Sequence, residues 1–160
     1  MHDRWQEQMK RVKRYFERFE RLNVGMVHSS PSEHYADDVL AFFQNCYHLK
    51  DHLKNDPAFT KHTGEEIEAF VSETPALALC ADLCNATKHL ILLRPPRSGH
   101  SPTFEGRHIS LHLTDSFVGA DKPAEPVSIS MHFRVDARGG MVDAFAIAED
   151  ALRAWESFVL

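Results

Sequence analysis

The 160-residue sequence has little glycine, proline or cysteine and no long hydrophobic run. Its 7 glycines and 8 prolines exclude a collagen-like or low-complexity chain. The lack of an 18-residue apolar stretch argues against a transmembrane helix, and the charged start MHDRWQEQMKR does not resemble a secretory signal. The three cysteines (Cys46, Cys80 and Cys84) include no C-x-x-C pair, so we interpret them as reduced and buried. These absences predict a cytoplasmic protein that does not bind a membrane.

The sequence also lacks the short motifs of the common nucleotide and hydrolase sites. No G-x-x-x-x-G-K, G-x-G-x-x-G, G-x-S-x-G or H-E-x-x-H occurs. P-loop, Rossmann, α/β-hydrolase and zincin functions therefore have no support.

Charge is distributed unevenly along the chain. Residues 1–22 carry seven basic and four acidic side chains, a net charge of +3, so the remainder carries −8 of the total of −5. A basic first helix on an otherwise acidic protein is suited to bind RNA or an acidic patch of a partner protein. The plainer interpretation is a solvated helix face with (i, i+4) ion pairs, such as Glu7 with Arg11.

Apolar residues recur at helical spacing over most of the chain and at strand spacing in one region. We predict a single α-rich (α+β) domain over residues 1–160: an up-and-down bundle of four to five helices with an inserted antiparallel β-hairpin at about residues 107–136. The predicted helices cover about residues 5–23, 32–55, 64–72 and 74–93, followed by a last helix that includes Phe145 to Val159, and the predicted strands cover 108–113 and 127–135.

Capping and turn residues predict where these elements begin and end. Ser30 or Ser32 is expected to cap the second helix, and Thr74-Pro75 is expected to begin the fourth. The pair Gly139-Gly140 is expected to end the second strand.

The segment of residues 77–93 combines an apolar helix face with a polar strip. On a helix, Asp82, Asn85 and His89 fall at i, i+3 and i+7, within about 60° of one another. Small or apolar residues flank them, so we expect the strip to be partly enclosed and its polar groups to have partners.

The second helix is the expected source of those partners. If it lies antiparallel to the fourth, His48 and Asp51 would face the polar strip. A histidine beside a carboxylate is held in one tautomer with a raised pKa, which suits general acid or base catalysis near neutral pH.

The heptapeptide Leu83-Cys84-Asn85-Ala86-Thr87-Lys88-His89 resembles the signature helix of the HEPN superfamily, in which an arginine is followed by a polar residue, usually asparagine, and by a histidine. The resemblance covers these seven residues and, loosely, the helical bundle. Asn85 and His89 match the polar residue and the histidine. Cys84 stands where the family has the arginine that holds the phosphate, and the nearest cations are Lys88, Arg94 and Arg97.

The resemblance implies a homodimer in which two such motifs face each other in a cleft. It also implies RNA binding or metal-independent RNA cleavage, without a cofactor, in a defence or toxin-antitoxin system. In a ribonuclease of this kind, His89 would act as acid or base, and Asn85 and Asp82 would position it.

Two alternatives use the same side chains. His48 and His52 form an (i, i+4) pair that can chelate a metal, with Asp51, Asp82 or His89 completing the site. Alternatively, the polar strip and His48 form a satisfied hydrogen-bond network in a non-catalytic protein-interaction or structural module.

The predicted hairpin carries three further histidines, His108, His112 and His132, on the polar faces of neighbouring strands. Three imidazoles can bind a transition metal or respond to pH. A solvated or interfacial sheet face is the simpler interpretation, because serines and Arg134 alternate with them.

Overall fold

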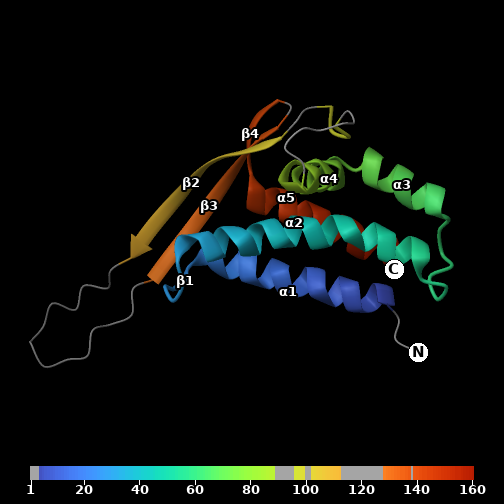
Figure 1. The fold of residues 1–160 in the computed structure, drawn as a ribbon, viewed down its shortest axis with the longest axis horizontal. Coiled ribbons are helices and arrows are strands. Elements are labelled where there is room, and N and C mark those ends of the chain that lie inside the picture. The colour runs from blue at the N-terminus through green and yellow to red at the C-terminus, as the bar shows by residue number, and fades with distance from the viewer. Residues whose placement is uncertain (1–3, 89–95, 100–101, 113–127, 138) are drawn as a thin grey trace, which may run out of the picture.

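A computed structural model describes residues 4–88, 96–99, 102–112, 128–137 and 139–160 (Figure 1). The helices are α1 (Arg4–Val24), α2 (Ser32–Asn55), α3 (Gly64–Glu73), α4 (Pro75–Lys88) and α5 (Ala144–Val159). The strands are β1 (Met26–Val27), β2 (Thr103–His112), β3 (Ser128–Ala137) and β4 (Gly140–Asp143). This helix-rich fold with a small antiparallel sheet confirms the predicted α-rich α+β class. Within these ranges, none of the helices has the length and apolar character needed to cross a bilayer.

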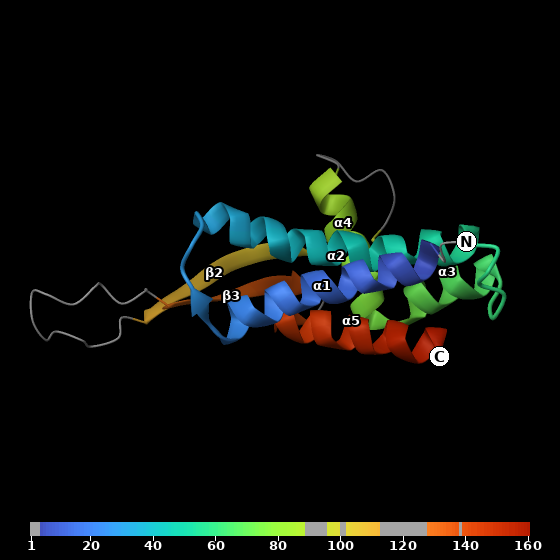
Figure 2. The same ribbon diagram turned by 90° about the horizontal axis from the view of Figure 1, so that it is seen from below.

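Helices α1, α2 and α5 form the long layer of the molecule. They lie side by side, with α1 antiparallel to both others (Figures 1 and 2). The apolar stripe of α1 is buried against α2 and α5, and one polar residue is buried with it: Gln8 donates from Nε2 to the main-chain oxygen of Asn45 at 3.0 Å. Helix α5 is also joined to α2, because Trp155 of α5 donates from Nε1 to the Cys46 carbonyl at 3.0 Å.

The sheet packs on the same layer through β3, its central strand. The strand order is β1-β3-β2, and β4 also pairs with β3, all antiparallel. Alternate residues of β3 are apolar and buried: Ile129, Met131, Phe133 and Val135. The Phe19 ring of α1 meets the Phe133 ring edge-on at 6.3 Å between centroids. The period-two pattern of the sequence therefore marks the face that turns toward α1.

The predicted N-cap of the second helix needs correction. Neither serine caps α2: the N-cap residue is Pro31, with no side-chain cap hydrogen bond. The reason is that the Tyr35 hydroxyl accepts hydrogen bonds from the Ser29 and Ser30 amides, at 2.9 and 3.1 Å, and pins the preceding segment.

The sheet also continues beyond the predicted hairpin. Gly139-Gly140, with φ of 104° and 123°, follows the end of β3 at Ala137, as predicted, and leads into the unpredicted strand β4. Strands β1 and β4 were not predicted because, at two and four residues, they are too short to show an alternating pattern. Residues 89–93, which were predicted to complete the fourth helix, lie outside the described residues.

Helix α4 does not lie antiparallel to α2, as the site prediction assumed. It is seen nearly end-on in Figure 1 and runs upright across α2 in Figure 2, so the two helices cross steeply. The short α3 turns the chain before α4 begins at Pro75. A steep crossing brings one short stretch of each helix together instead of two long faces.

Candidate functional site

At the crossing of α2 and α4, the structure places His48 next to Cys84. The distance from His48 Nε2 to Cys84 Sγ is 3.8 Å. All three cysteines are free and buried, which confirms that part of the prediction. Burial raises the pKa of the Cys80 thiol well above its usual value, and the nearby Cys46 thiol raises it further. The Cys80 thiol therefore stays protonated, and all three cysteines belong to the core.

Asp82 is enclosed, as predicted, but its partners come from an unexpected segment. Its side chain is 2% exposed. One carboxylate oxygen accepts from the Arg97 amide at 2.8 Å, and the other accepts from the Ser98 amide at 2.8 Å and the Ser98 hydroxyl at 2.6 Å. Asp82 thus folds the segment of residues 96–99 back onto the helices.

This anchoring brings Arg97 onto the surface formed by α2 and α3. Its guanidinium donates to Ser72 Oγ at 3.0 Å and to Glu68 Oε2 at 2.9 Å. The same group lies over the Tyr47 ring, 5.7 Å from the centroid. Tyr47 directly precedes His48 in α2, and the centroids of these two rings are 6.0 Å apart.

Glu68 also pairs with two cationic side chains of α2. Lys50 and Lys54 donate to its Oε1 at 2.8 and 2.7 Å. Burial alone would raise the pKa of Glu68, but the hydrogen bonds from Lys50, Lys54 and Arg97 outweigh that effect and lower it to about 2. We call these four charged residues and Tyr47 the cation cluster.

The cation cluster carries more positive than negative charge. Three cations face Glu68, and Lys50 also meets Asp51 at 3.0 Å, which leaves one positive charge in excess. Lys50, Lys54 and Glu68 were not predicted from the sequence, because their pairing joins two helices. The (i, i+4) spacing of the two lysines was the only sequence signal available.

The chain matches no protein-family model, curated protein or solved structure in comparisons with known proteins.

The remaining predicted site residues lie in different places. The half-exposed Asp51 and its neighbour His52 line a separate hollow of about 270 Å³ near the start of α1. Asn85 is partly exposed, one turn after Asp82, and His89 lies outside the described residues. The structure thus joins His48 to α4 and Asp82 to the 96–99 segment, while Asp51 lies beside Lys50.

The metal alternative gains no support from the part of the chain that the structure describes. There, no group of three or more His, Cys, Asp and Glu side chains is arranged to hold a metal ion. His48 lies against Cys84, whereas His52 lines the hollow near α1. On the hairpin, the register pairs His108 with His132, and the side chains of β2 lie outside what the structure describes.

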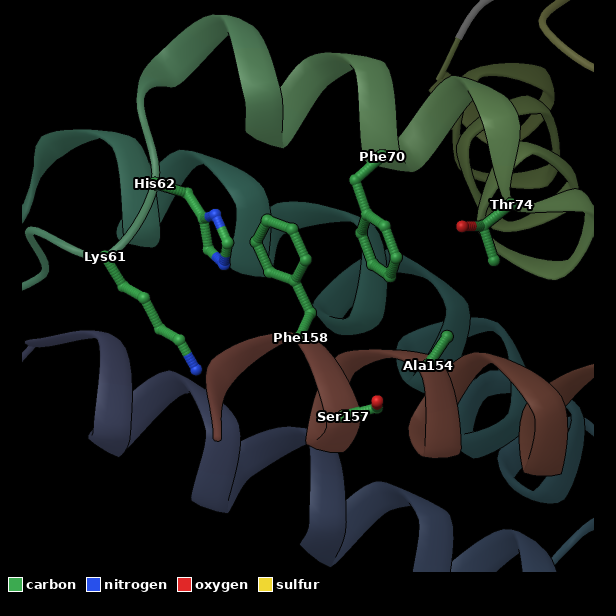
Figure 3. Close-up of a pocket in the computed structure, with 7 residues that line it drawn as sticks. All are labelled: Lys61, His62, Phe70, Thr74, Ala154, Ser157 and Phe158. Atoms are coloured by element: carbon green, nitrogen blue, oxygen red, sulfur yellow. The ribbon is translucent and has the colours of Figure 1, made fainter.

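A larger hollow, of about 400 Å³, lies between α3 and α5 (Figure 3). Its wall is a row of three rings: His62 stacks on Phe158 at 4.1 Å, and Phe158 stacks on Phe70 at 4.2 Å. Both faces of Phe158 are thereby covered by its neighbours. Because the ring faces are used for packing α3 against α5, this hollow offers a ligand ring edges, the exposed Lys61 and the hydroxyls of Thr74 and Ser157.

Proposed function

We propose that this protein is a HEPN-like, metal-independent RNA-processing protein in which Arg97 holds the substrate phosphate. The resemblance of residues 83–89 supplies the polar residue and the histidine but has Cys84 in place of the arginine. The observation that carries the proposal is the anchoring of residues 97 and 98 by Asp82, which brings an arginine over the ring of Tyr47, the residue that precedes His48.

The chemistry needs a base, an acid and a cation. The 2′-hydroxyl of the RNA loses its proton to the base and attacks the adjacent phosphorus, and the leaving 5′-oxygen receives a proton from the acid. A fixed cation stabilises the negative charge that builds up on the phosphoryl oxygens. In the proposal, His89 acts as acid or base, Asn85 positions it, Arg97 is the cation, and His48 is a second imidazole near the crossing.

Arg97 is suited to this role because its position is fixed while donors remain free for a ligand. A guanidinium has five N–H donors, and the bonds to Ser72 and Glu68 use two of them. Its side chain is 27% exposed, so a phosphate can reach it. Arginine is also the side chain whose planar fork fits phosphate oxygens best.

A second candidate function is a non-catalytic module in a protein assembly. The observation that favours it is the near-complete burial of Asp82, whose three hydrogen bonds have an evident structural purpose. On this proposal, the polar residues of α4 only fix the fold, and a partner protein binds elsewhere.

A cleavage assay on single-stranded RNA with EDTA present distinguishes the two candidates. We expect the wild-type chain to cleave, Arg97→Gln to lower kcat/KM by about 100-fold, and His89→Ala to abolish cleavage with little change in the thermal midpoint. Lys54→Gln is the matched control, since it removes a cation from Glu68 without touching Arg97, and it should cleave within a few-fold of wild type.

The opposite results would favour the structural module. Absence of RNA cleavage by the wild-type chain rejects the enzyme. If His89→Ala instead destabilises the fold by about 1–3 kcal/mol, the histidine belongs to a buried hydrogen-bond network.

The proposal includes a homodimer, as the family resemblance implies. Light scattering on the purified chain should give about twice the 18.3 kDa of one copy. A mass of one copy at micromolar concentration would reject the dimer.

A further inference from the structure

A polar hollow of about 240 Å³ lies where the end of α1 meets the start of α2. It is at the opposite end of α2 from α3 and the cation cluster, beside β1 (Figure 1). Arg18 and Arg21 line it from α1, Ser29 and Ser30 from the connecting segment, and His34 from α2. The proposed RNA-processing site uses none of these residues.

The two arginines leave the hollow positively charged. Arg18 is fixed by Asp38, at 3.1 Å from Nη1 to Oδ1, and by the Tyr15 ring, 5.1 Å from its guanidinium carbon. Within the described ranges, the Arg21 side chain has neither an ion-pair nor a hydrogen-bond partner. Two guanidinium groups therefore face a single carboxylate, on a chain whose net charge is −5.

The connecting segment is held so that it completes the wall. The Tyr35 hydroxyl, on a side chain only 4% exposed, accepts from the Ser29 and Ser30 amides. Burial tends to raise the pKa of Tyr35, but hydrogen bonds from the amides and side chains of Ser29 and Ser30 outweigh it and lower the pKa. The two amides are thus occupied, and the serine hydroxyls, which also interact with Tyr35, border the hollow.

The start of α2 adds to the positive potential. Its N-cap residue, Pro31, provides no side-chain oxygen to the first turn of this 24-residue helix. The amino end of a helix carries a partial positive charge and favours anions. The arginines, the serine hydroxyls and this helix end therefore favour the same kind of ligand.

We propose that this hollow is a binding site for a phosphate group. Guanidinium groups bind phosphate oxygens through paired N–H donors, and the serine hydroxyls that border the hollow can rotate to add further donors. Arg14, Arg18 and Arg21 follow one another at i, i+4 and i+7 along α1 and are exposed, so a cationic strip leads away from the hollow. The phosphate belongs either to a small molecule or to a nucleic-acid strand that continues along this strip.

Calorimetric titration of the full chain tests the site, with inorganic phosphate and with a short oligoribonucleotide that carries either a 5′-phosphate or a 5′-hydroxyl. We expect saturable, millimolar binding of phosphate by the wild type and at least tenfold weaker binding by Arg21→Gln. Arg153→Gln is the control: it removes the same charge from an exposed position on α5, and it should bind as wild type does.

The oligonucleotides distinguish the two sources of the phosphate. Tighter binding of the 5′-phosphorylated strand than of inorganic phosphate, lost again in Arg14→Gln, assigns the site to nucleic acid. Equal affinities for the 5′-phosphorylated strand and for inorganic phosphate assign the site to a small phosphate compound.

The proposal is overturned if the wild type shows no saturable phosphate binding, or if Arg153→Gln weakens binding as much as Arg21→Gln. Because Arg97 is proposed to hold a phosphate at the RNA site, the titration is repeated in an Arg97→Gln background, where Arg21→Gln should still weaken phosphate binding at least tenfold. A failure of RNA cleavage and a failure of this site can therefore be told apart.

Discussion

Glu68 shows how one carboxylate can organise side chains from three segments. Lys50 and Lys54 reach it from α2 and Arg97 from the segment after α4. Removing this carboxylate would leave three cations close together, with Asp51 as the remaining counter-charge on Lys50. The position of Arg97 therefore depends on Glu68 as well as on Asp82.

The lowered pKa of Glu68 predicts a specific loss of stability in acid. Because its pKa is about 2 in the folded chain and near 4.5 when unfolded, its contribution is complete above about pH 5 and is lost as the pH falls toward 2. We expect a loss on the order of 1–2 kcal/mol, since nearly a third of the side chain lies in water, where ion pairs are screened. Urea unfolding at a series of pH values measures it, and Glu68→Gln should have a flatter acid limb.

We predict that replacing Asp82 frees the segment of residues 96–99 and exposes the peptide bond after Arg97 to proteolysis. Asp82→Asn retains the shape but can no longer accept all three hydrogen bonds, so we expect a cost of about 1–3 kcal/mol. The freed segment should be cut by trypsin after Arg97 several-fold faster, which mass spectrometry of the fragments would show. Asp150→Asn, at an exposed ion pair on α5, is the control, and equal cutting in both variants would contradict the anchoring.

At the scale of elements, α3 depends on its first turn more than the longer helices do. It has only ten residues and begins with a capping box: the Thr63 side chain accepts from the Glu66 amide, and the Glu66 side chain accepts from the Thr63 amide. Thr63→Ala should destabilise the chain by about 1 kcal/mol in urea unfolding. Thr60→Ala, at an exposed threonine of the same connection, should change stability by less than half as much.

The helices were predictable from the sequence because each has a long apolar stripe and a recognisable stop. The prediction of residues 32–55 for the second helix matches α2, and Thr74-Pro75 correctly marks the start of α4. The capping of α2 was not predictable, because it depends on the Tyr35 hydroxyl reaching back to the preceding segment. Such a contact has no fixed spacing in the sequence.

The candidate site was only partly predictable for a related reason. The burial of Asp82 follows from its small and apolar neighbours along the helix. Its hydrogen bonds to residues 97 and 98, however, depend on how the chain returns after α4. The proximity of His48 to α4 was expected, but the steep crossing gives it Cys84 as a neighbour and leaves Asp51 beside Lys50. Helix periodicity predicts faces, whereas crossing angles depend on the packing of the whole core.

At the scale of the whole molecule, Phe19 joins the helical layer to the sheet. Its ring is fully buried, with centroids 5.2 Å from Phe145 of α5, 6.2 Å from Phe43 of α2 and 6.3 Å from Phe133 of β3. A side chain shared by both layers couples their unfolding, because neither layer can separate without exposing it. The helices and the sheet should therefore unfold as one unit.

The last prediction tests this coupling. Phe19→Ala should cost about 3–5 kcal/mol, since it leaves a cavity at the junction of the two layers. Native-state hydrogen exchange should show amides of β3 and of α2 losing protection together, by the same free energy. Val24→Ala, at a 77% exposed position of α1, is the control and should change stability by less than about 0.5 kcal/mol. Loss of protection in β3 alone would mean that the sheet opens independently, and the position of Phe19 between the layers would then not determine cooperativity.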